Sequence, residues 1–272
     1  MRIISICPSN TEIVEYLGLT SSLVGVDDFS DWPKEVTRLP RLGPDLNIDM
    51  DKVEELQPDI VLASLSVPGM EKNVEELEKR KIPHIVLNPN SLEEIGENLL
   101  FAGHHLGVSY KAEAVHKQYR DFLELYHTLS SKVDHKLNLY WEWWPKPIFT
   151  PGRVNWLTEV SELAGGRNVF ASENQASVET DWEDVRRRDP DIICMVWVGV
   201  KTEKMNPDLV RKRPNWSNMK AIQQDQIVLL DENLFCRPSP RLLEGIQKLG
   251  SLLHPSIFPE YMQKDPLRSG EK

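Results

Sequence analysis

The sequence is poor in cysteine and carries no surplus of positive charge. Each of these two shortages excludes a class of function. Its 272 residues include three cysteines, Cys7, Cys194 and Cys236, at no spacing that suits a metal site or a disulfide framework. Cys7 and Cys194 lie in apolar runs, so we interpret them as small buried hydrophobic residues. The formal net charge of −10 argues against nucleic acid as a partner, because phosphate binding needs clustered Lys and Arg.

Long apolar runs and leader features are also missing. No apolar run reaches the roughly 18 residues of a membrane-spanning helix, so no membrane segment is expected. The chain opens on residues 3–7, which already resemble a folded strand, without the charged region and cleavage site of a signal peptide. We therefore expect a cytoplasmic protein if the sequence is whole, and an extracytoplasmic one if it is a trimmed piece.

The sequence lacks the signatures of common enzymes. It contains no Gly-x-Ser-x-Gly, no phosphate-binding loop and no Gly-x-Gly-x-x-Gly, and its carboxylates are scattered. The seven histidines include one close pair, His104 and His105, which would point to different faces of a helix. The chain is therefore predicted to have no catalytic residue, no metal site and no obligatory cofactor. An axial histidine for a bound haem stays open.

What the sequence does contain is a repeated segment. Residues 57–62, Gln-Pro-Asp-Ile-Val-Leu, return as residues 189–194, Asp-Pro-Asp-Ile-Ile-Cys, which is 132 positions later (189 minus 57). Each copy follows a short helical stretch (50–56 and 181–188) and precedes another strand (82–87 and 226–230). Strands that alternate with helices predict parallel sheets covered by helices. The predicted fold class is α/β, with two Rossmann-like lobes.

A long helical stretch separates the two copies. Residues 110–132 contain neither Gly nor Pro, and their apolar positions follow one helical stripe. The predicted parts are an N-terminal lobe (1–108), a bridging helix (109–133), a C-terminal lobe (134–258) and a polar tail (259–272). Two lobes joined by one helix favour a ligand cleft between them.

Five segments, in order, resemble those of one family. They are residues 3–12 (Ile-Ile-Ser-Ile-Cys-Pro-Ser-Asn-Thr-Glu), 28–33, 56–63, 149–170 with its Gly-Gly-Arg-Asn-Val-Phe, and 237–243 (Arg-Pro-Ser-Pro-Arg-Leu-Leu). Spread over about residues 1–255, they resemble the class III, helical-backbone substrate-binding proteins of ABC importers, and most closely the cobalamin-binding branch. The resemblance implies rigid lobes, a corrinoid ligand, an ABC permease dimer as partner and a monomer. Members usually carry a signal peptide or lipid anchor, which this sequence does not show.

Ligands of parallel α/β sheets bind outside the carboxyl ends of the strands, and this rule selects the candidate residues. They are Pro8, Ser9, Asn10, Phe29, Trp32 and Leu65 in the first lobe, and Trp143, Trp144, Trp197, Asn233 and Arg237 in the second. Aromatic walls suit a flat corrin or porphyrin. Because Trp141 and Trp143 share a face of their strand, at least one of them is expected to be packed inside.

Arg237 and the acidic candidates allow both a functional and a structural interpretation. By the resemblance, Asn233 and Arg237 would face the amide rim of a corrinoid, whereas Arg237 could instead pair with Glu232 and order its loop. Leu65 stands where cobalamin binders carry an aromatic residue. The resemblance also implies permease-docking acids, here Glu71 and Glu203, although an acid at a helix start also complements the helix dipole.

Three functions are weighed, all without catalysis. The leading one is corrinoid binding for an ABC importer. The second is binding of a ferric siderophore or haem, which are usually anionic, while the selected loops offer few basic residues (Lys146, Lys201 and Arg237). The third is a cytoplasmic corrinoid chaperone or sensor.

Overall fold

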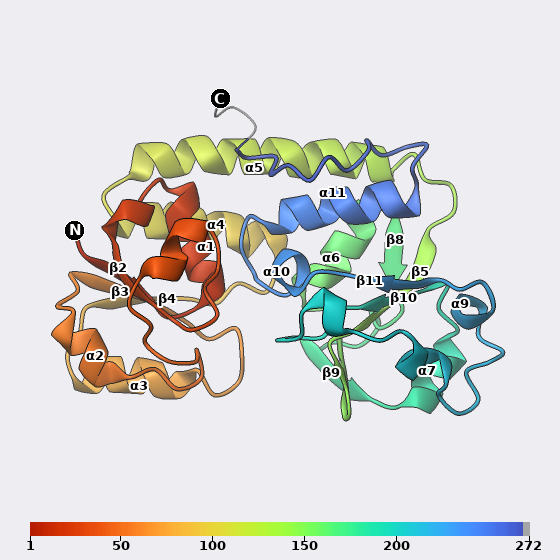
Figure 1. Cartoon of the computed structure of the whole chain (residues 1–272). Helices are drawn as coiled ribbons and strands as arrows, with labels where there is room; N and C mark the ends of the chain where they lie inside the picture. The colour runs from red at the N-terminus through yellow and green to blue at the C-terminus, as the bar shows by residue number, and fades with distance from the viewer. Residues whose placement is uncertain (269–272) are drawn as a thin grey trace. The chain divides into compact units, whose positions relative to one another are not determined.

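The computed structural model describes residues 1–268, which form two compact units (Figure 1). Unit 1 holds Met1–Arg120 with Pro238–Pro240, and unit 2 holds Asp121–Arg237 with the chain from Arg241 onward. The division falls inside the long helix α5 (Ser109–Ser130). The predicted boundaries treat this helix as a part of its own, and they stay a prediction. The last four residues of the predicted tail, 269–272, lie outside the described residues.

Unit 1 is built on a parallel sheet of order β2-β1-β3-β4. Its strands are β1 (Ile3–Ser5), β2 (Leu23–Val26), β3 (Ile60–Ser64) and β4 (His84–Leu87). Its helices are α1 (Pro8–Tyr16), η1 (Thr20–Ser22), η2 (Lys34–Arg38), α2 (Met50–Glu55), α3 (Glu71–Lys79) and α4 (Leu92–His105). Ile4 and Val61 of the sheet pack with Val53 of α2 and Leu77 of α3, so these two helices cover one face. Figure 1 shows α1 and α4 on the other face.

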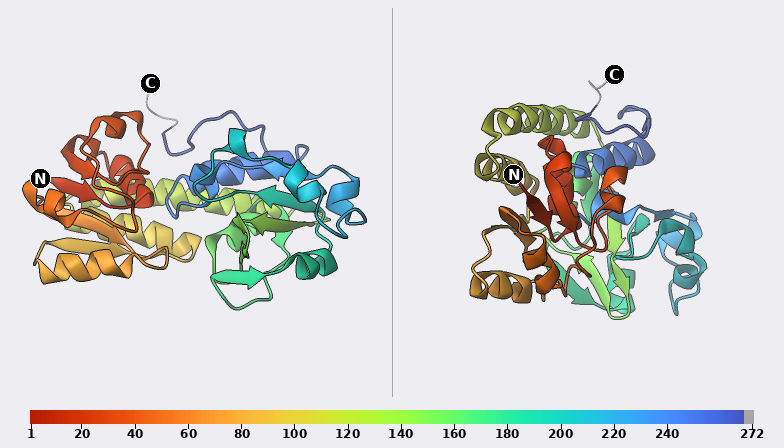
Figure 2. Two further views of the ribbon diagram at one scale, coloured as in Figure 1. Left: turned by 60° about the horizontal axis from the view of Figure 1, so that its bottom comes forward. Right: turned by 60° about the vertical axis from the view of Figure 1, so that its left-hand side comes forward.

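Unit 2 repeats this plan with a parallel sheet of order β11-β10-β5-β8. Its strands are β5 (Leu137–Glu142), β8 (Gly166–Asn168), β10 (Ile192–Met195) and β11 (Ile227–Leu229). Its helices are α6 (Trp156–Leu163), α7 (Trp182–Arg188), η3 (Thr202–Lys204), α8 (Asp208–Arg211), α9 (Lys220–Gln223), α10 (Glu232–Phe235) and α11 (Leu242–Leu253). Tyr140 and Ile193 pack with Val185 of α7 and Val210 of α8. Figures 1 and 2 show α11 on the opposite face of the sheet.

The two parallel sheets have equivalent strand orders. If the second is read from its other edge, β8-β5-β10-β11 matches β2-β1-β3-β4 position by position, with the repeated segment on β3 and β10. Gln57 and Asp189, which precede these strands, both adopt the left-handed conformation (φ 45° and 42°). The carboxylates of Asp59 and Asp191 each accept a hydrogen bond from a backbone N–H at the start of β1 or β5, at 2.6 and 2.8 Å. The predicted α/β fold of two lobes with parallel sheets is therefore confirmed.

A short C-terminal segment completes unit 1. Ser239, within Pro238–Pro240, donates a hydrogen bond through its hydroxyl to the carboxylate of Glu12. Both side chains are fully buried. A buried carboxylate is costly unless hydrogen bonds stabilise it, so this late segment contributes to the N-terminal part of the core.

Helix α1 begins at Pro8, directly after Cys7, and Pro suits the first helical turn because it lacks an N–H. Unit 2 also holds an antiparallel sheet that was not predicted: β6 (Trp144–Pro145), β7 (Ile148–Pro151) and β9 (Ser177–Thr180). Within residues 1–268, no helix has the length and apolar character needed to cross a membrane.

Candidate functional site

The first turn of α1, shortly after β1, places its polar side chains inside unit 1. Asn10 donates from Nδ2 to the carbonyl oxygen of Ala63 at the end of β3 (2.9 Å). The Ser9 hydroxyl lies 3.3 Å from the Cys7 thiol. Ser9 and Asn10 are buried, as is Pro8 in the first turn of α1. Asn10 therefore ties the first turn of α1 to the end of β3, whereas Ser9 makes a local contact with Cys7.

The loop after β2 is organised by Asp27. Its Oδ1 accepts hydrogen bonds from the backbone N–H groups of Phe29 (2.8 Å) and Ser30 (3.0 Å), and its Oδ2 accepts from the Ser30 hydroxyl (2.5 Å). Burial raises the pKa of Asp27 to about 6, although the Ser30 hydroxyl and the Phe29 N–H oppose this shift. The loop is thereby held with the Phe29 side chain 51% exposed.

Further contacts tighten the same loop. Arg41 donates from Nη1 to the carbonyl oxygens of Asp27 (2.6 Å) and Ser30 (2.7 Å). Trp32 is half-buried, and its ring lies 5.4 Å from that of Tyr16, measured between centroids. Leu65, which follows β3, is also half-buried. In unit 1 the structure therefore leaves Phe29, Trp32 and Leu65 as the predicted residues with exposed side-chain surface.

In unit 2 the end of β5 carries two neighbouring tryptophans. Trp144 is 44% exposed, and its Nε1 donates to the carbonyl oxygen of Lys146 (3.1 Å). Trp143 is half-buried, and its Nε1 lies out of contact with solvent without a hydrogen-bond partner among the described residues. Trp141 is fully buried and donates from Nε1 to Ser161 (2.8 Å), which confirms that one of the pair Trp141 and Trp143 is packed inside.

Trp197 belongs to the core of unit 2. It is 8% exposed, and its Nε1 donates to Oε1 of the buried Glu142 (3.0 Å). Oε2 of Glu142 accepts from the Tyr140 hydroxyl (2.9 Å), and Arg213 donates to both carboxylate oxygens (2.5 and 2.8 Å). Burial and the nearby Glu142 carboxylate raise the pKa of Tyr140, so its hydroxyl stays protonated and donates.

Helix α10, which follows β11, carries the polar candidates. Oδ1 of Asn233 is shielded from solvent and has no hydrogen-bond partner among residues 1–268. Arg237 is buried and donates from Nη2 to Oε2 of Glu232 (3.3 Å). The predicted pairing of Arg237 with Glu232 is therefore present.

The two predicted docking acids are exposed. Glu71 is the first residue of α3, and its Oε2 accepts from the backbone N–H of Gly69 (2.7 Å). Glu203 lies in the short helix η3. Sequence reasoning missed Asp27, Glu142 and Arg213. A signal existed for Glu142, which is a charged residue inside the aromatic run of 140–144, but its partner Arg213 is 71 positions away.

The described residues contain no group of three His, Cys, Asp or Glu side chains arranged for a metal ion. The arrangement instead combines exposed aromatic surface with shielded, unpaired polar atoms at the carboxyl edge of a parallel sheet. Such an arrangement suits reversible binding of a small molecule, since apolar surface supplies affinity and a few polar atoms fix orientation.

Comparison with known proteins identifies the family. Residues 3–234 match the periplasmic binding protein family. The ABC transporter substrate-binding lipoprotein YvrC of Bacillus subtilis is 30% identical over 271 residues, 95% of this chain and 82% of the relative. A vitamin B12-binding protein of Vibrio parahaemolyticus is 29% identical over 248 residues, 90% of this chain and 86% of the relative.

A solved structure agrees on the fold. The periplasmic heme-binding protein of Pseudomonas aeruginosa superposes with a TM-score of 0.82 at 24% identity, covering 98% of this chain and 96% of that one. Together with the duplicated α/β plan, the match over residues 3–234 shows that the chain belongs to the periplasmic binding protein family and is a class III substrate-binding protein.

Proposed function

We propose that this protein binds a corrinoid, without catalysis, as the substrate-binding component of an ABC importer. The likeness to a vitamin B12-binding protein over 90% of the chain supports this choice of ligand. The likeness to an ABC transporter substrate-binding lipoprotein supports the importer. In this role the protein works outside the cytoplasm, and cell fractionation separates the proposal from a cytoplasmic corrinoid chaperone or sensor.

The observation that carries the ligand assignment is a pair of unpaired polar atoms at one sheet edge. Trp143 follows β5 and presents a donor, Nε1, while Asn233 follows β11 and presents an acceptor, Oδ1. A shielded polar atom without a partner is costly, so a ligand that pairs with it gains affinity. The primary amides on the rim of a corrinoid both donate and accept. The carboxylates of haem accept only, and leave the Asn233 oxygen without a donor.

Aromatic surface supplies the second part of the proposal. Trp144 and Phe29 are the most exposed of the predicted aromatic residues, at 44% and 51%. An indole buried against a flat macrocycle removes a large apolar area from water. In unit 2 we assign ligand contacts to Trp144, Trp143, Asn233 and Arg237, while Phe29 and Trp32 of unit 1 stay predictions.

Titration of the purified protein tests the ligand directly. Cyanocobalamin, hemin and a neutral ferric siderophore are each added in a calorimeter, and tryptophan fluorescence is followed with correction for ligand absorption. We expect saturation at one cyanocobalamin per chain and no saturable binding of the other two. The absence of both heat and co-elution at about 100 µM cyanocobalamin contradicts the corrinoid proposal. Saturable hemin binding in its place favours the haem alternative.

Replacement of Trp144 tests the proposed contact. Trp144→Ala should weaken cyanocobalamin binding by about 1–3 kcal/mol, the contribution of a large buried apolar side chain. The matched control is Phe101→Ala, because Phe101 of α4 is also 44% exposed and stands outside the proposed contacts. An unchanged affinity together with a lower unfolding free energy would show that Trp144 serves the fold alone.

A further inference from the structure

Glu142 and Arg213 form an ion pair that is almost completely withdrawn from water. Their side chains are 0% and 4% exposed, and the carboxylate accepts four hydrogen bonds, from Arg213 (two), Tyr140 and Trp197. Such a pair adds little stability compared with apolar side chains of the same volume, because the desolvation of two charges offsets their attraction. What it does supply is a fixed geometry, since a guanidinium and a carboxylate join in a single planar arrangement.

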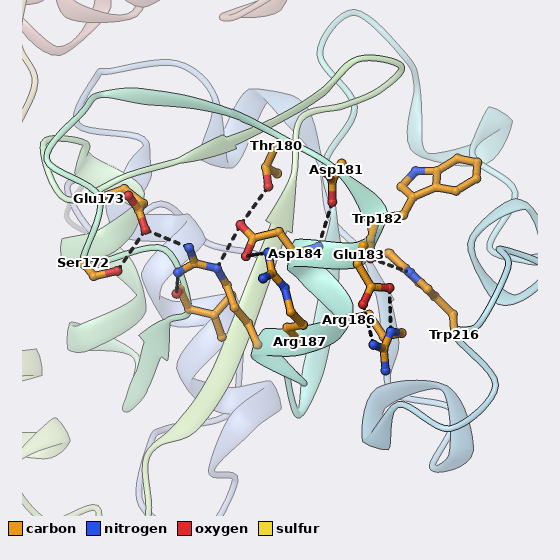
Figure 3. Close-up of polar contacts among 12 residues, drawn as sticks. Ser172, Glu173, Thr180, Asp181, Trp182, Glu183, Asp184, Arg186, Arg187 and Trp216 are labelled. Atoms are coloured by element: carbon orange, nitrogen blue, oxygen red, sulfur yellow. Dashed lines mark hydrogen bonds and ion pairs between the residues drawn. The ribbon is translucent and has the colours of Figure 1, made fainter.

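Contacts continue from this ion pair toward the surface. The Arg213 guanidinium lies 4.6 Å from the ring centroid of Trp216 and 5.3 Å from that of Trp182. Trp216 donates from Nε1 to the carbonyl oxygen of Trp182 (3.0 Å), as Figure 3 shows. Lys146 places its Nζ 5.5 Å from the same Trp182 ring. The backbone carbonyl of Lys146 accepts the indole N–H of Trp144.

The loop that carries Trp144 has little structure of its own. Strand β6 is only two residues long and pairs with β7 alone, through Trp144 with Phe149 and Pro145 with Ile148. Strand β7 is also paired with β9, but β6 is an edge strand with only these two residue pairs. The loop is held at its start by backbone hydrogen bonds of Trp143, whose N–H donates to Phe149 (3.0 Å) and whose carbonyl accepts from Val198 (3.1 Å), and by the neighbouring Glu142. Farther along, its contact is that of Lys146 with the Trp182 ring.

We propose that Glu142 and Arg213 are positioning residues for ligand binding: through Trp182 and Lys146 they fix the loop 143–147, and with it the indole of Trp144, before the ligand arrives. The inference rests on the proposed function in that it takes Trp144 to be a ligand contact. When a contact side chain is already ordered in the free protein, less conformational entropy is lost as the ligand binds.

The test removes both charges together, so that neither is left buried alone. In Glu142→Gln/Arg213→Met the amide oxygen still accepts from Trp197, and the amide N–H₂ donates to the Tyr140 oxygen. We expect cooperative unfolding to persist, while the affinity for cyanocobalamin falls by about tenfold as preorganisation is lost. The effects should not add: Trp144→Ala weakens the parent strongly but weakens the double variant by less than about threefold.

Arg188 provides the matched control, because it anchors the same unit but has no contact with this loop. Its guanidinium donates to the Val169 carbonyl (2.8 Å), to Glu173 (2.7 Å) and to Asp184 (3.3 Å). Arg188→Met should lower the unfolding midpoint. It should leave the cyanocobalamin affinity and the effect of Trp144→Ala unchanged.

A second readout needs no ligand. The eight tryptophans are labelled as 5-fluorotryptophan, and Trp144→Phe and Trp156→Phe assign two ¹⁹F resonances. The Trp144 resonance should shift or broaden in the double variant. The Trp156 resonance should not, since its indole bonds to the carbonyl of Phe235 on another part of the unit. If the double variant fails to fold, Arg213→Lys is measured in the same way. It keeps the positive charge but lacks the planar guanidinium that bonds to both carboxylate oxygens.

The outcomes separate the two proposals. If the parent protein does not bind cyanocobalamin, the corrinoid assignment fails, and the ¹⁹F spectrum alone decides the positioning role. An unchanged Trp144 resonance overturns that role whatever the ligand is. If cyanocobalamin binds, an additive mutant cycle overturns it as well, whereas a non-additive cycle with a perturbed Trp144 resonance supports it.

Discussion

Asp27 is a buried carboxylic acid within the loop that carries Phe29, and burial shifts its titration toward neutral pH. Its pKa is raised to about 6, mainly by desolvation. Because the unfolded chain holds that proton less tightly, the folded protein binds more protons between about pH 4 and pH 6. Stability from this group is therefore present at low pH and falls as pH rises through that window. At pH 7 the buried charge costs about 3 kcal/mol, at 1.36 kcal/mol per pKa unit.

Asp27→Asn should remove this pH dependence. The amide oxygen still accepts from the Phe29 and Ser30 N–H groups, and no charge is buried. The variant should be more stable than the parent by about 1–3 kcal/mol at pH 7, and the difference should vanish near pH 4. Urea unfolding of both proteins between these pH values measures it.

Asp49→Asn is the control of opposite sign. The backbone N–H of Lys52 lowers the pKa of this helix-capping carboxylate, so its contribution is lost as pH falls. A difference between parent and Asp27→Asn that stays constant from pH 4 to pH 7 would show that Asp27 is not a titrating buried group.

For individual residues, the alternation of side chains along a strand predicted burial better than it predicted hydrogen-bond partners. At least one of Trp141 and Trp143, which share a strand face, was expected inside, and Trp141 is fully buried. Asn10 was selected for its position after a strand, yet its amide turns inward to Ala63. A strand-end rule locates a residue but does not orient its side chain, which depends on nearby acceptors that are distant in sequence.

At the scale of elements, α4 and α5 approach closely at one glycine. A Cβ added at Gly103 would lie 2.3 Å from the Cβ of Ala112, whereas one added at Gly96 would meet the movable ring of His116, at 3.1 Å, and Cδ1 of Tyr119, at 3.4 Å. Gly103→Ala should therefore lower the unfolding free energy by about 1–3 kcal/mol through overpacking. Gly96→Ala should cost less, because alanine favours a helix over glycine by about 1 kcal/mol.

Exchanging the two small residues tests the cause. Gly103→Ala/Ala112→Gly restores the space and leaves the number of helical glycines unchanged, so its urea midpoint should return close to that of the parent. A double variant as unstable as Gly103→Ala would contradict close packing as the reason.

The longer elements were predictable because hydrophobic periodicity and caps act locally. The helical stretches expected at 50–56, 110–132 and 181–188 appear as α2 (Met50–Glu55), α5 (Ser109–Ser130) and α7 (Trp182–Arg188). The strands of the antiparallel sheet that was not predicted, β6, β7 and β9, have two to four residues each, too few to show a period. Their positions follow from tertiary contacts such as the pairing of Trp144 with Phe149.

For the whole molecule, the proposed importer role predicts a separation between binding and delivery. Glu71→Ala removes an exposed charge at the start of α3, far in sequence from the proposed ligand contacts of unit 2. Cyanocobalamin affinity should be unchanged, while stimulation of ATP hydrolysis by the reconstituted importer should fall. Glu203→Ala is expected to behave alike.

The matched control for docking is Glu75→Ala. Glu75 is exposed on the same helix, so the change in net charge is identical. Equal loss of stimulation in Glu71→Ala and Glu75→Ala would point to a general effect of charge rather than to docking by Glu71.

The hydrogen bond between Ser239 and Glu12 limits how early unit 1 can complete its folding during synthesis. The two residues are 227 positions apart, yet both belong to unit 1. The ribosome synthesises the first 120 residues long before it adds Pro238–Pro240. The N-terminal part of a nascent chain must therefore wait, with Glu12 lacking its bond to Ser239, until most of unit 2 has been translated. The first unit to be started thus completes its buried polar contacts late, after residues 121–237 of unit 2 have been made.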